Sequence, residues 1–219
     1  HREPSALQDQ ELGGYPLGNK GRIGVTPSRR CAAKPLKTTH NVGRFSFLET
    51  CMINIGDTLP ATTLVEFMDT EGNGCSLGPN PVNVAEAAAG KTIALFAVPG
   101  AFTPTCSAQH VPGFVAKADE FKAAGVDEIW CVSVNDAFVM GAWARDQKTV
   151  GKVRMLADGD AAFTKATGLT LDLTGKGLGL RSNRYSMLVK DGKVVQLNVE
   201  GPGQFTVSDA DTLLAQARA

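Results

Sequence analysis

The sequence predicts an α/β protein with a central mixed β-sheet flanked by helices. Between Thr92 and Thr167, short apolar runs alternate with amphipathic stretches, a pattern typical of parallel strands joined by helical crossovers. Two further apolar runs flank Asp191-Gly192, a residue pair typical of a tight antiparallel hairpin. The amphipathic stretch from Ser208 to Ala217 then predicts a closing helix.

Few elements are expected before the central strand. Thr62 to Met68 predicts a short strand, and Thr70 to Gly74 a glycine-containing turn. Val84 to Ala89 predicts a short helix that ends at Gly90. Thr92 to Val98 is almost continuously apolar, which indicates a strand buried on both faces of a sheet.

A helix is expected to follow this strand directly. Pro99-Gly100 ends the strand, and Thr103-Pro104 offers an N-cap followed by proline at the first helical position. The helix should continue to about Ala124 and stop at Gly125. Its apolar residues recur at spacings of three and four and mark one buried face: Val111, Phe114, Val115, Ala118 and Phe121.

The remaining strands and helices complete the predicted sheet. Strands are expected over Asp127 to Val134, Val153 to Ala157, Tyr185 to Lys190 and Lys193 to Val199. Helices are expected from Ala137 to about Gln147 and, as a turn or two, from Asp160 to Thr167. Parallel strands followed by an antiparallel hairpin and a terminal helix, with a cysteine at the start of a helix after a central strand, are what a thioredoxin-like fold requires.

Composition excludes several classes of function. The chain has 219 residues, 43% of them apolar, which suits one core of moderate size. No apolar run approaches the roughly 18 to 20 residues of a membrane span, so no membrane association is expected. The 22 Lys and Arg balance the 22 Asp and Glu, which leaves no electrostatic footprint for nucleic acid.

Residues 1–48 differ in composition from the rest. They carry eight basic and three acidic residues, with none acidic from Leu12 through Leu48. Basic, hydroxylated and acid-poor composition is typical of an organelle transit peptide, for plastid or mitochondrion. The alternative is a translated upstream region or a non-native extension, with Met52 as the true start and a cytoplasmic protein. We expect residues 1–48 to be a disordered leader and residues 49–219 to be the folded domain.

The cysteines indicate neither a disulfide scaffold nor a metal site. They are odd in number and scattered: Cys31, Cys51, Cys75, Cys106 and Cys131. No two are separated by only two residues, and the chain has only three histidines. A structural zinc site therefore lacks its usual ligand spacing. We predict no metal and no cofactor.

Cys106 is the candidate nucleophile. It lies two residues after Pro104, in the first turn of the predicted helix, where unpaired N–H groups and the helix dipole favour a thiolate. The simpler interpretation is a buried structural cysteine, because free cysteine is among the most buried residue types. The segment Pro99-Gly-Ala-Phe-Thr-Pro-Thr-Cys106 favours chemistry, since it places a strand end, a turn, a hydroxyl and a helix start around one sulfur.

This segment resembles the Pro-x-x-x-Thr-x-x-Cys active-site motif of peroxiredoxins. Other segments resemble the type II, or five-type, subfamily, and together the similarity covers about residues 53–219. They are Ile55-Gly-Asp-Thr-Leu-Pro, His110-Val-Pro-Gly-Phe, Val132-Ser-Val-Asn-Asp, Phe138-Val-Met, Gly179-Leu-Arg-Ser-Asn-Arg-Tyr-Ser-Met and Asn198-Val-Glu. The resemblance implies a thiol peroxidase that reduces hydrogen peroxide and small organic (alkyl) hydroperoxides through a cysteine sulfenic acid.

The resemblance also implies a role for four residues. Cys106 would be the peroxidatic cysteine, and Thr103 would hydrogen bond the peroxide. Arg184 would favour the thiolate and stabilise charge on the leaving oxygen with its rigid donor fork. Pro99 would shield the sulfur and shape the turn. Simpler interpretations are helix capping for Thr103 and a solvated surface charge for Arg184. The chemistry requires that Cys106 and Arg184 meet and that solvent can reach the sulfur.

Two neighbouring residues receive smaller roles. Arg181 is a possible partner in the site, but a strand would point it to the opposite face from Arg184, three residues later. His110 is expected to be a packed helix residue with a supporting role at most.

The thiol that recycles the sulfenic acid stays open. Cys131 resembles the second cysteine of plant-type members, but it lies in an apolar run where a buried structural cysteine would also fit. Cys75 has no motif support, and Gly201 to Val207 contains no cysteine. The least demanding route is an external thiol, glutathione with glutaredoxin or thioredoxin, that attacks Cys106 directly.

Other functions and partners are also considered. A redox-sensing or holdase chaperone protein would use the same cysteine or a dimer surface. A disulfide oxidoreductase is disfavoured, because Cys106 has no partner cysteine three residues away. The resemblance implies a homodimer packed near the active site, with the apolar Ala101-Phe102 turn as a contact.

Overall fold

The computed structural model describes residues 52–69 and 77–219. The leader expected at residues 1–48 and the turn expected from Thr70 to Gly74 lie outside the described residues. Within the described ranges, no helix is long and apolar enough to cross a membrane. The same ranges contain no group of three or more His, Cys, Asp or Glu side chains that could hold a metal ion.

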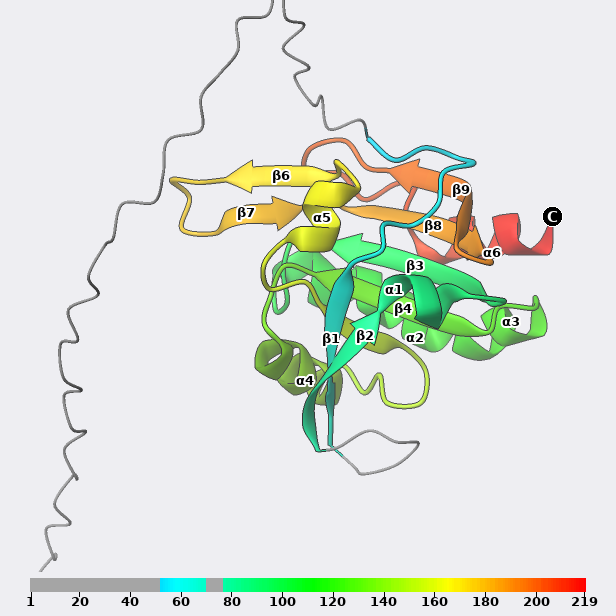
Figure 1. Cartoon of the computed structure of the whole chain (residues 1–219), viewed down its shortest axis with the longest axis horizontal. Coiled ribbons are helices and arrows are strands. Elements are labelled where there is room, and N and C mark those ends of the chain that lie inside the picture. The colour runs from blue at the N-terminus through cyan, green and yellow to red at the C-terminus, as the bar shows by residue number, and fades with distance from the viewer. Residues whose placement is uncertain (1–51, 70–76) are drawn as a thin grey trace, which may run out of the picture. The chain divides into compact units, whose positions relative to one another are not determined.

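The centre of the fold is a seven-stranded mixed sheet with the strand order β2-β1-β5-β4-β3-β8-β9 (Figure 1). Its strands are β1 (Thr63–Met68), β2 (Gly78–Asn83), β3 (Thr92–Val98), β4 (Glu128–Ser133), β5 (Arg154–Ala157), β8 (Tyr185–Lys190) and β9 (Lys193–Val199). Strands β3, β4 and β5 run parallel, whereas β8 pairs antiparallel with β3 and β1 pairs antiparallel with β5. The predicted mixed sheet is confirmed.

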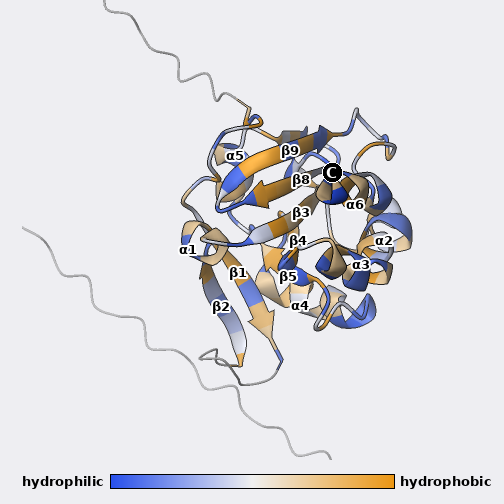
Figure 2. Ribbon diagram, turned by 90° about the vertical axis from the view of Figure 1, so that its right-hand side faces the viewer, coloured by the Kyte–Doolittle hydropathy of each residue, from blue (hydrophilic) through white to orange (hydrophobic). Residues whose placement is uncertain are grey.

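Helices cover both faces of this sheet (Figure 2). On one face lie α2 (Val111–Ala116), α3 (Ala118–Ala123), α4 (Ala137–Asp146) and α6 (Ala210–Arg218). On the other lie α1 (Val84–Ala88) and α5 (Ala162–Ala166). Alternate residues of β3 enter the two cores, Phe96 on the first face and Leu95 on the second, and both are fully buried. The apolar run of β3 thus serves two cores, as predicted for a strand covered on both sides.

The helix that carries Cys106 is not one uniform α-helix. After Pro104 and Thr105 the backbone widens into a π-helical turn, η1 (Cys106–His110), which continues as α2. Lys117 then departs from helical geometry and separates α2 from α3. The helix nevertheless ends near Gly125 as predicted, and its apolar face is buried, with Val111, Phe114 and Phe121 fully covered.

Two strand pairings were not predicted from the sequence, although β1 itself was predicted as a strand. Strand β2 contains Pro79 and Pro81, which cannot donate backbone hydrogen bonds, so the segment lacks a strand signal. It is tolerated because β2 is an edge strand that pairs only with β1. The second pair, β6 (Thr170–Leu173) and β7 (Gly179–Ser182), forms a separate two-stranded antiparallel sheet.

The predicted hairpin between β8 and β9 is confirmed. Asp191 and Gly192 have φ values of 48° and 73°, so both occupy the left-handed region that a tight hairpin turn needs. Strand β8 is thereby fixed beside β3, and the residue immediately before β8 is Arg184. This pairing brings a residue from late in the chain to the end of the strand that leads to Cys106.

Candidate active site

The turn between β3 and η1 is anchored to the end of β4. Ala101 donates its backbone N–H to Oδ1 of Asn135 at 2.9 Å, and Ser133 donates its hydroxyl to the same oxygen at 2.7 Å. At the start of the helix, Ser107 donates its N–H to the carbonyl of Thr103 at 3.0 Å. These contacts fix the position of Cys106 relative to the carboxyl ends of two parallel strands.

The guanidinium of Arg184 lies against the sulfur of Cys106. Its Nη2 donates to Sγ at 3.4 Å, although the two residues are 78 positions apart. The sulfur therefore faces a permanent positive charge and lies in the first turns of a helical segment that begins at Pro104. This combination can stabilise negative charge that develops on an oxygen beside the sulfur.

The same sulfur is closed to solvent. Cys106 is 0% exposed, so the expectation that solvent reaches its sulfur is not met in this conformation. Phe96 and Phe114 pack in the same core cluster as Cys106. A peroxide can reach the sulfur only if a neighbouring side chain or the first helical turn moves.

Thr103 and Pro99 lie on the turn as predicted, but the hydroxyl of Thr103 has a different partner from the one expected. It donates to the carbonyl of Gly100 at 2.8 Å and, among the described residues, makes no hydrogen bond to a helix N–H. A hydroxyl oxygen that donates its hydrogen still has lone pairs with which to accept another. Pro99 is half-buried at the end of β3.

The position of Arg181 corrects the prediction that it faces away from the site. Its Nε donates to the carbonyl of Leu178 at 2.7 Å and its Nη1 to the carbonyl of Pro99 at 3.4 Å. A Cβ at Gly100 would lie only 2.9 Å from Nη1, so glycine permits this close approach. The spacing argument was wrong because β7 ends at Ser182 and Arg184 lies outside any strand, so the alternation of a strand does not extend to it.

His110 contacts the other side of Arg184. Nη1 of Arg184 donates to Nδ1 of His110 at 3.1 Å, and Nε2 of His110 donates to the carbonyl of Ser208 at 3.0 Å. Burial, followed by the positive charge of Arg184, lowers the pKa of His110 to about 3 against the opposing effect of the Ser208 carbonyl. The helical pattern around His110 predicted its burial, but no local pattern could reveal a partner 74 residues away.

Cys131 lies in the middle of β4, in the same core cluster as Cys106. It is 0% exposed, and its strand is paired with β3 on one side and β5 on the other. Burial raises the pKa of the Cys131 thiol, and the neighbouring Cys106 raises it further. Both thiols are free. The folded state thus keeps Cys131 protonated and held by two neighbouring strands.

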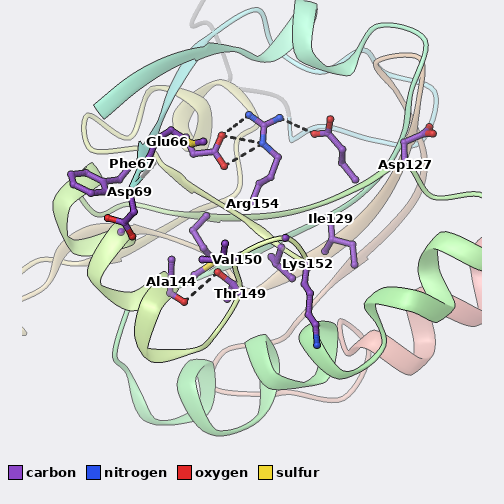
Figure 3. A pocket seen from close by; sticks show the side chains of 16 residues that line it. Glu66, Phe67, Asp69, Asp127, Ile129, Ala144, Thr149, Val150, Lys152 and Arg154 are labelled. Carbon is purple, nitrogen blue, oxygen red and sulfur yellow. Dashed lines mark hydrogen bonds and ion pairs between the residues drawn. The ribbon is translucent and has the colours of Figure 1, made fainter. Parts of the chain in front are cut away.

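A cavity of about 390 Å³ lies elsewhere (Figure 3), and neither Cys106 nor Arg184 lines it. Its lining includes Glu128 and Arg154 at the starts of β4 and β5, whereas Cys106 follows the end of the parallel strand β3. Arg154 donates to Glu66 at 2.6 Å and to Glu128 at 2.7 Å. Because two carboxylates satisfy its guanidinium, Arg154 is a structural arginine.

The lowered pKa values of two buried residues near the site, His110 and Glu200, predict that acid destabilises the fold. Burial would raise the pKa of Glu200, but backbone N–H groups of the 206–208 segment outweigh it and lower this pKa from 4.5 to about 2. The pKa of His110 falls from 6.5 to about 3. The unfolded chain therefore binds these protons at higher pH than the folded protein does. The contribution of His110 to stability is fully present above pH 6.5 and is lost as the pH falls toward 3. The contribution of Glu200 is fully present above pH 4.5 and is lost as the pH falls toward 2.

Urea unfolding at about pH 7, 5 and 4 checks this sign. The midpoint should decrease at each step, and His110→Asn should weaken the decrease between the first two values. A midpoint that stays constant from neutral to acid pH would contradict the prediction.

Comparisons with known proteins place this geometry in context. The redoxin family model matches residues 54–214. Peroxiredoxin-2C of Oryza sativa subsp. japonica is 51% identical over 162 residues, which are 74% of this chain and 96% of that protein. The chloroplastic Peroxiredoxin-2E of Arabidopsis thaliana is 49% identical over 167 residues, 75% of this chain and 69% of that protein.

Two solved structures are similar to this chain in sequence and in fold. Reduced Prx3 of Vibrio vulnificus in complex with H2O2 is 51% identical with a TM-score of 0.70, covering 76% of this chain and 99% of that one. A Burkholderia cenocepacia protein described as a putative thioredoxin reductase is 61% identical with a TM-score of 0.74, covering 75% and 98%.

Proposed function

Since the chain belongs to the redoxin family and is a type II peroxiredoxin, and therefore a peroxidase, we propose that it reduces hydrogen peroxide and small organic hydroperoxides at Cys106. The observation that carries this assignment is the 3.4 Å contact between Nη2 of Arg184 and the Cys106 sulfur at the start of a helix. The test is peroxide consumption by the purified protein with a thiol donor, assayed alongside the Cys106→Ser variant.

The proposed reaction is a displacement at one peroxide oxygen. The Cys106 thiolate attacks this oxygen, a sulfur–oxygen bond forms and the oxygen–oxygen bond breaks. The sulfur loses two electrons and becomes a sulfenic acid, while the other oxygen leaves as water or an alcohol after it takes up a proton. Arg184 stabilises the charge on that leaving oxygen with its donor fork.

Thr103 and Pro99 would orient the peroxide. The Thr103 oxygen donates its hydrogen to the carbonyl of Gly100, which leaves its lone pairs to accept a hydrogen bond from the peroxide. Such an acceptor opposite the Arg184 donors would align the peroxide with the sulfur. Pro99, half-buried at the start of the turn, would exclude bulk water from the sulfur. Because Cys106 is fully buried, we infer that this turn moves aside to admit the peroxide.

An external thiol is the proposed reductant, either glutathione with glutaredoxin or thioredoxin. The sulfenic acid condenses with this thiol to a mixed disulfide and water, and a second thiol releases the reduced Cys106. The buried position of Cys131 within three paired strands supports this route, because an internal disulfide would require the Cys106 helix to unwind.

Mass spectrometry of peroxide-treated protein tests the recycling route. With glutathione present, we expect a mixed disulfide between Cys106 and glutathione, and Cys131→Ser should retain turnover with glutathione and glutaredoxin within about twofold, as a substitution outside the route should. A disulfide between Cys106 and Cys131 in the wild type, together with loss of turnover in Cys131→Ser, would show an internal resolving cysteine instead.

We also propose a homodimer that packs around the active-site turn. Phe102 is 53% exposed beside Trp143, and Phe138 is 66% exposed at the start of the neighbouring helix α4. Phe102 has a φ of 60°, a strained value for an aromatic residue, so the turn holds this ring outward at some energetic cost. Two exposed aromatic rings near one site support a subunit contact there.

The proposed compartment is an organelle, plastid or mitochondrion. Residues 1–48 would be the targeting leader and residues 49–219 the enzyme. The basic, acid-poor composition of the leader supports this, as does the chloroplastic location in the name of the Arabidopsis relative.

A further inference from the structure

A line of buried polar contacts leads from Arg184 away from the sulfur. His110 accepts from Arg184 through Nδ1 at 3.1 Å and contacts the carbonyl of Ser208 through Nε2 at 3.0 Å. A carbonyl can only accept, so Nε2 carries the proton and Nδ1 is left free to accept from the guanidinium. The tautomer that suits Arg184 is thus selected by Ser208. Both His110 and Ser208 are buried.

The far end of this line is Glu200, the residue after β9. Its Oε1 accepts from the backbone N–H groups of Thr206, Val207 and Ser208 at 2.7, 2.8 and 2.8 Å. The Ser208 hydroxyl donates to the same oxygen at 2.9 Å. Glu200 is only 8% exposed. One buried carboxylate therefore fixes three consecutive residues, including the one whose carbonyl holds His110.

Phe205, the residue before the three that Glu200 fixes, adds an aromatic contact. The ring of Phe205 lies 4.9 Å from the His110 ring, and the Arg184 guanidinium carbon lies 5.6 Å from its centroid. The imidazole and the aromatic ring thus contact the guanidinium together. Glu200 also donates its own N–H to the carbonyl of Arg184 at 3.0 Å, so the backbones at the two ends of the network are joined.

We propose that Glu200 is a positioning residue for peroxide reduction, acting through Ser208 and His110 to hold the Arg184 guanidinium against Cys106. This rests on the proposed peroxidase function and adds to it a residue that does not touch the sulfur. If Glu200 only stabilised the connection between β9 and α6, its loss would lower stability and leave the rate of Cys106 oxidation unchanged.

Rate constants for Cys106 oxidation by hydrogen peroxide test the proposal. Trp143 is a built-in reporter, because its indole N–H donates to the hydroxyl of Ser107, next to Cys106, at 3.1 Å. We expect Glu200→Ala and His110→Leu each to slow oxidation by about tenfold or more, the size of coupling typical within one hydrogen-bonded network. Glu200→Gln and His110→Asn, which keep an acceptor in place, should recover most of the rate.

Asp209→Ala is the matched control. Asp209 lies on the same connection and caps α6 by accepting from the N–H of Thr212 at 3.0 Å, but within the described part of the chain it makes no hydrogen bond to His110 or Arg184. Its loss should lower the unfolding midpoint and leave the oxidation rate within about twofold, as expected for a lost helix cap. An equal loss of rate in Asp209→Ala and Glu200→Ala would overturn the proposal.

A double-mutant cycle decides whether the effect passes through Arg184. In an Arg184→Gln background, His110→Leu and Glu200→Ala should change the rate by less than about twofold, because the group that they position is gone. An undiminished effect in that background would overturn the proposal, and so would wild-type rates in Glu200→Ala and His110→Leu. Failure of the wild type itself to consume peroxide would instead overturn the proposed function.

Discussion

Cys106→Ser loses all peroxide turnover above the buffer background. A serine hydroxyl remains protonated at neutral pH and cannot form a sulfenic acid, so neither the first displacement nor the recycling step can occur. The measurement is NADPH-coupled peroxide consumption with glutathione and glutaredoxin, repeated with thioredoxin and its reductase. The result should be the same with both donors, because the loss precedes the reductant.

Cys131→Ser is the matched control for this experiment. It removes a second buried thiol from the same core cluster and keeps Cys106. We expect it to consume peroxide, with at most a lower unfolding midpoint from the hydroxyl placed in an apolar core. If Cys106→Ser kept full turnover, the peroxidase assignment to this residue would be wrong.

Arg184→Ala slows the oxidation of Cys106 by about 10²- to 10³-fold, the loss expected when a donor to a developing negative charge is removed from a buried site. In the proposed mechanism the guanidinium contacts the reacting sulfur and stabilises the leaving oxygen, so the substitution removes both interactions together. Stopped-flow fluorescence under single-turnover conditions measures this step separately from recycling.

Arg145→Gln serves as the control for removing an arginine. Arg145 is exposed and pairs with Asp69 at 2.7 Å, a type of surface ion pair that contributes little to stability. The rate of Cys106 oxidation in the Arg145→Gln variant should match that of the wild type. Equal rates for Arg184→Ala and Arg145→Gln would remove the guanidinium from the mechanism.

Local sequence signals predicted the elements that build the sheet around the site. The runs at β3 and β4 are apolar over nearly their whole length, since both strands are buried on two faces. Asp191-Gly192 predicted the hairpin because a tight hairpin turn needs two residues with positive φ values, which this pair adopts readily. Strand β2 was not predicted because Pro79 and Pro81 are typical of turns. Both prolines are tolerated because β2 lies at the edge of the sheet.

The sequence predicted some residues of the candidate site and not others, for a physical reason. The turn and helix start around Cys106 depend on residues adjacent in the chain, so this segment alone predicted Cys106 as the candidate nucleophile. Arg184 was implied by a family resemblance, whereas Arg181, His110 and Glu200 owe their positions to contacts between distant elements. Hydrophobic periodicity reports which face a residue occupies and not which partner it meets there.

Access to the sulfur could not be predicted from the sequence either. The pattern placed Cys106 at a helix start, where exposure and burial are equally compatible with the spacing. Its complete burial depends on packing against Phe96 and Phe114, a tertiary property. The proposed reaction at Cys106 therefore requires a neighbouring side chain or the first helical turn to move.

Trapping of the sulfenic acid tests the central claim most directly. Protein treated with one equivalent of hydrogen peroxide in the presence of dimedone, then digested and analysed by mass spectrometry, should carry the label on Cys106, with Cys131 unmodified. The label should form far more slowly in Arg184→Ala. A label on another cysteine, or an unmodified Cys106 in protein that has consumed peroxide, would contradict the account.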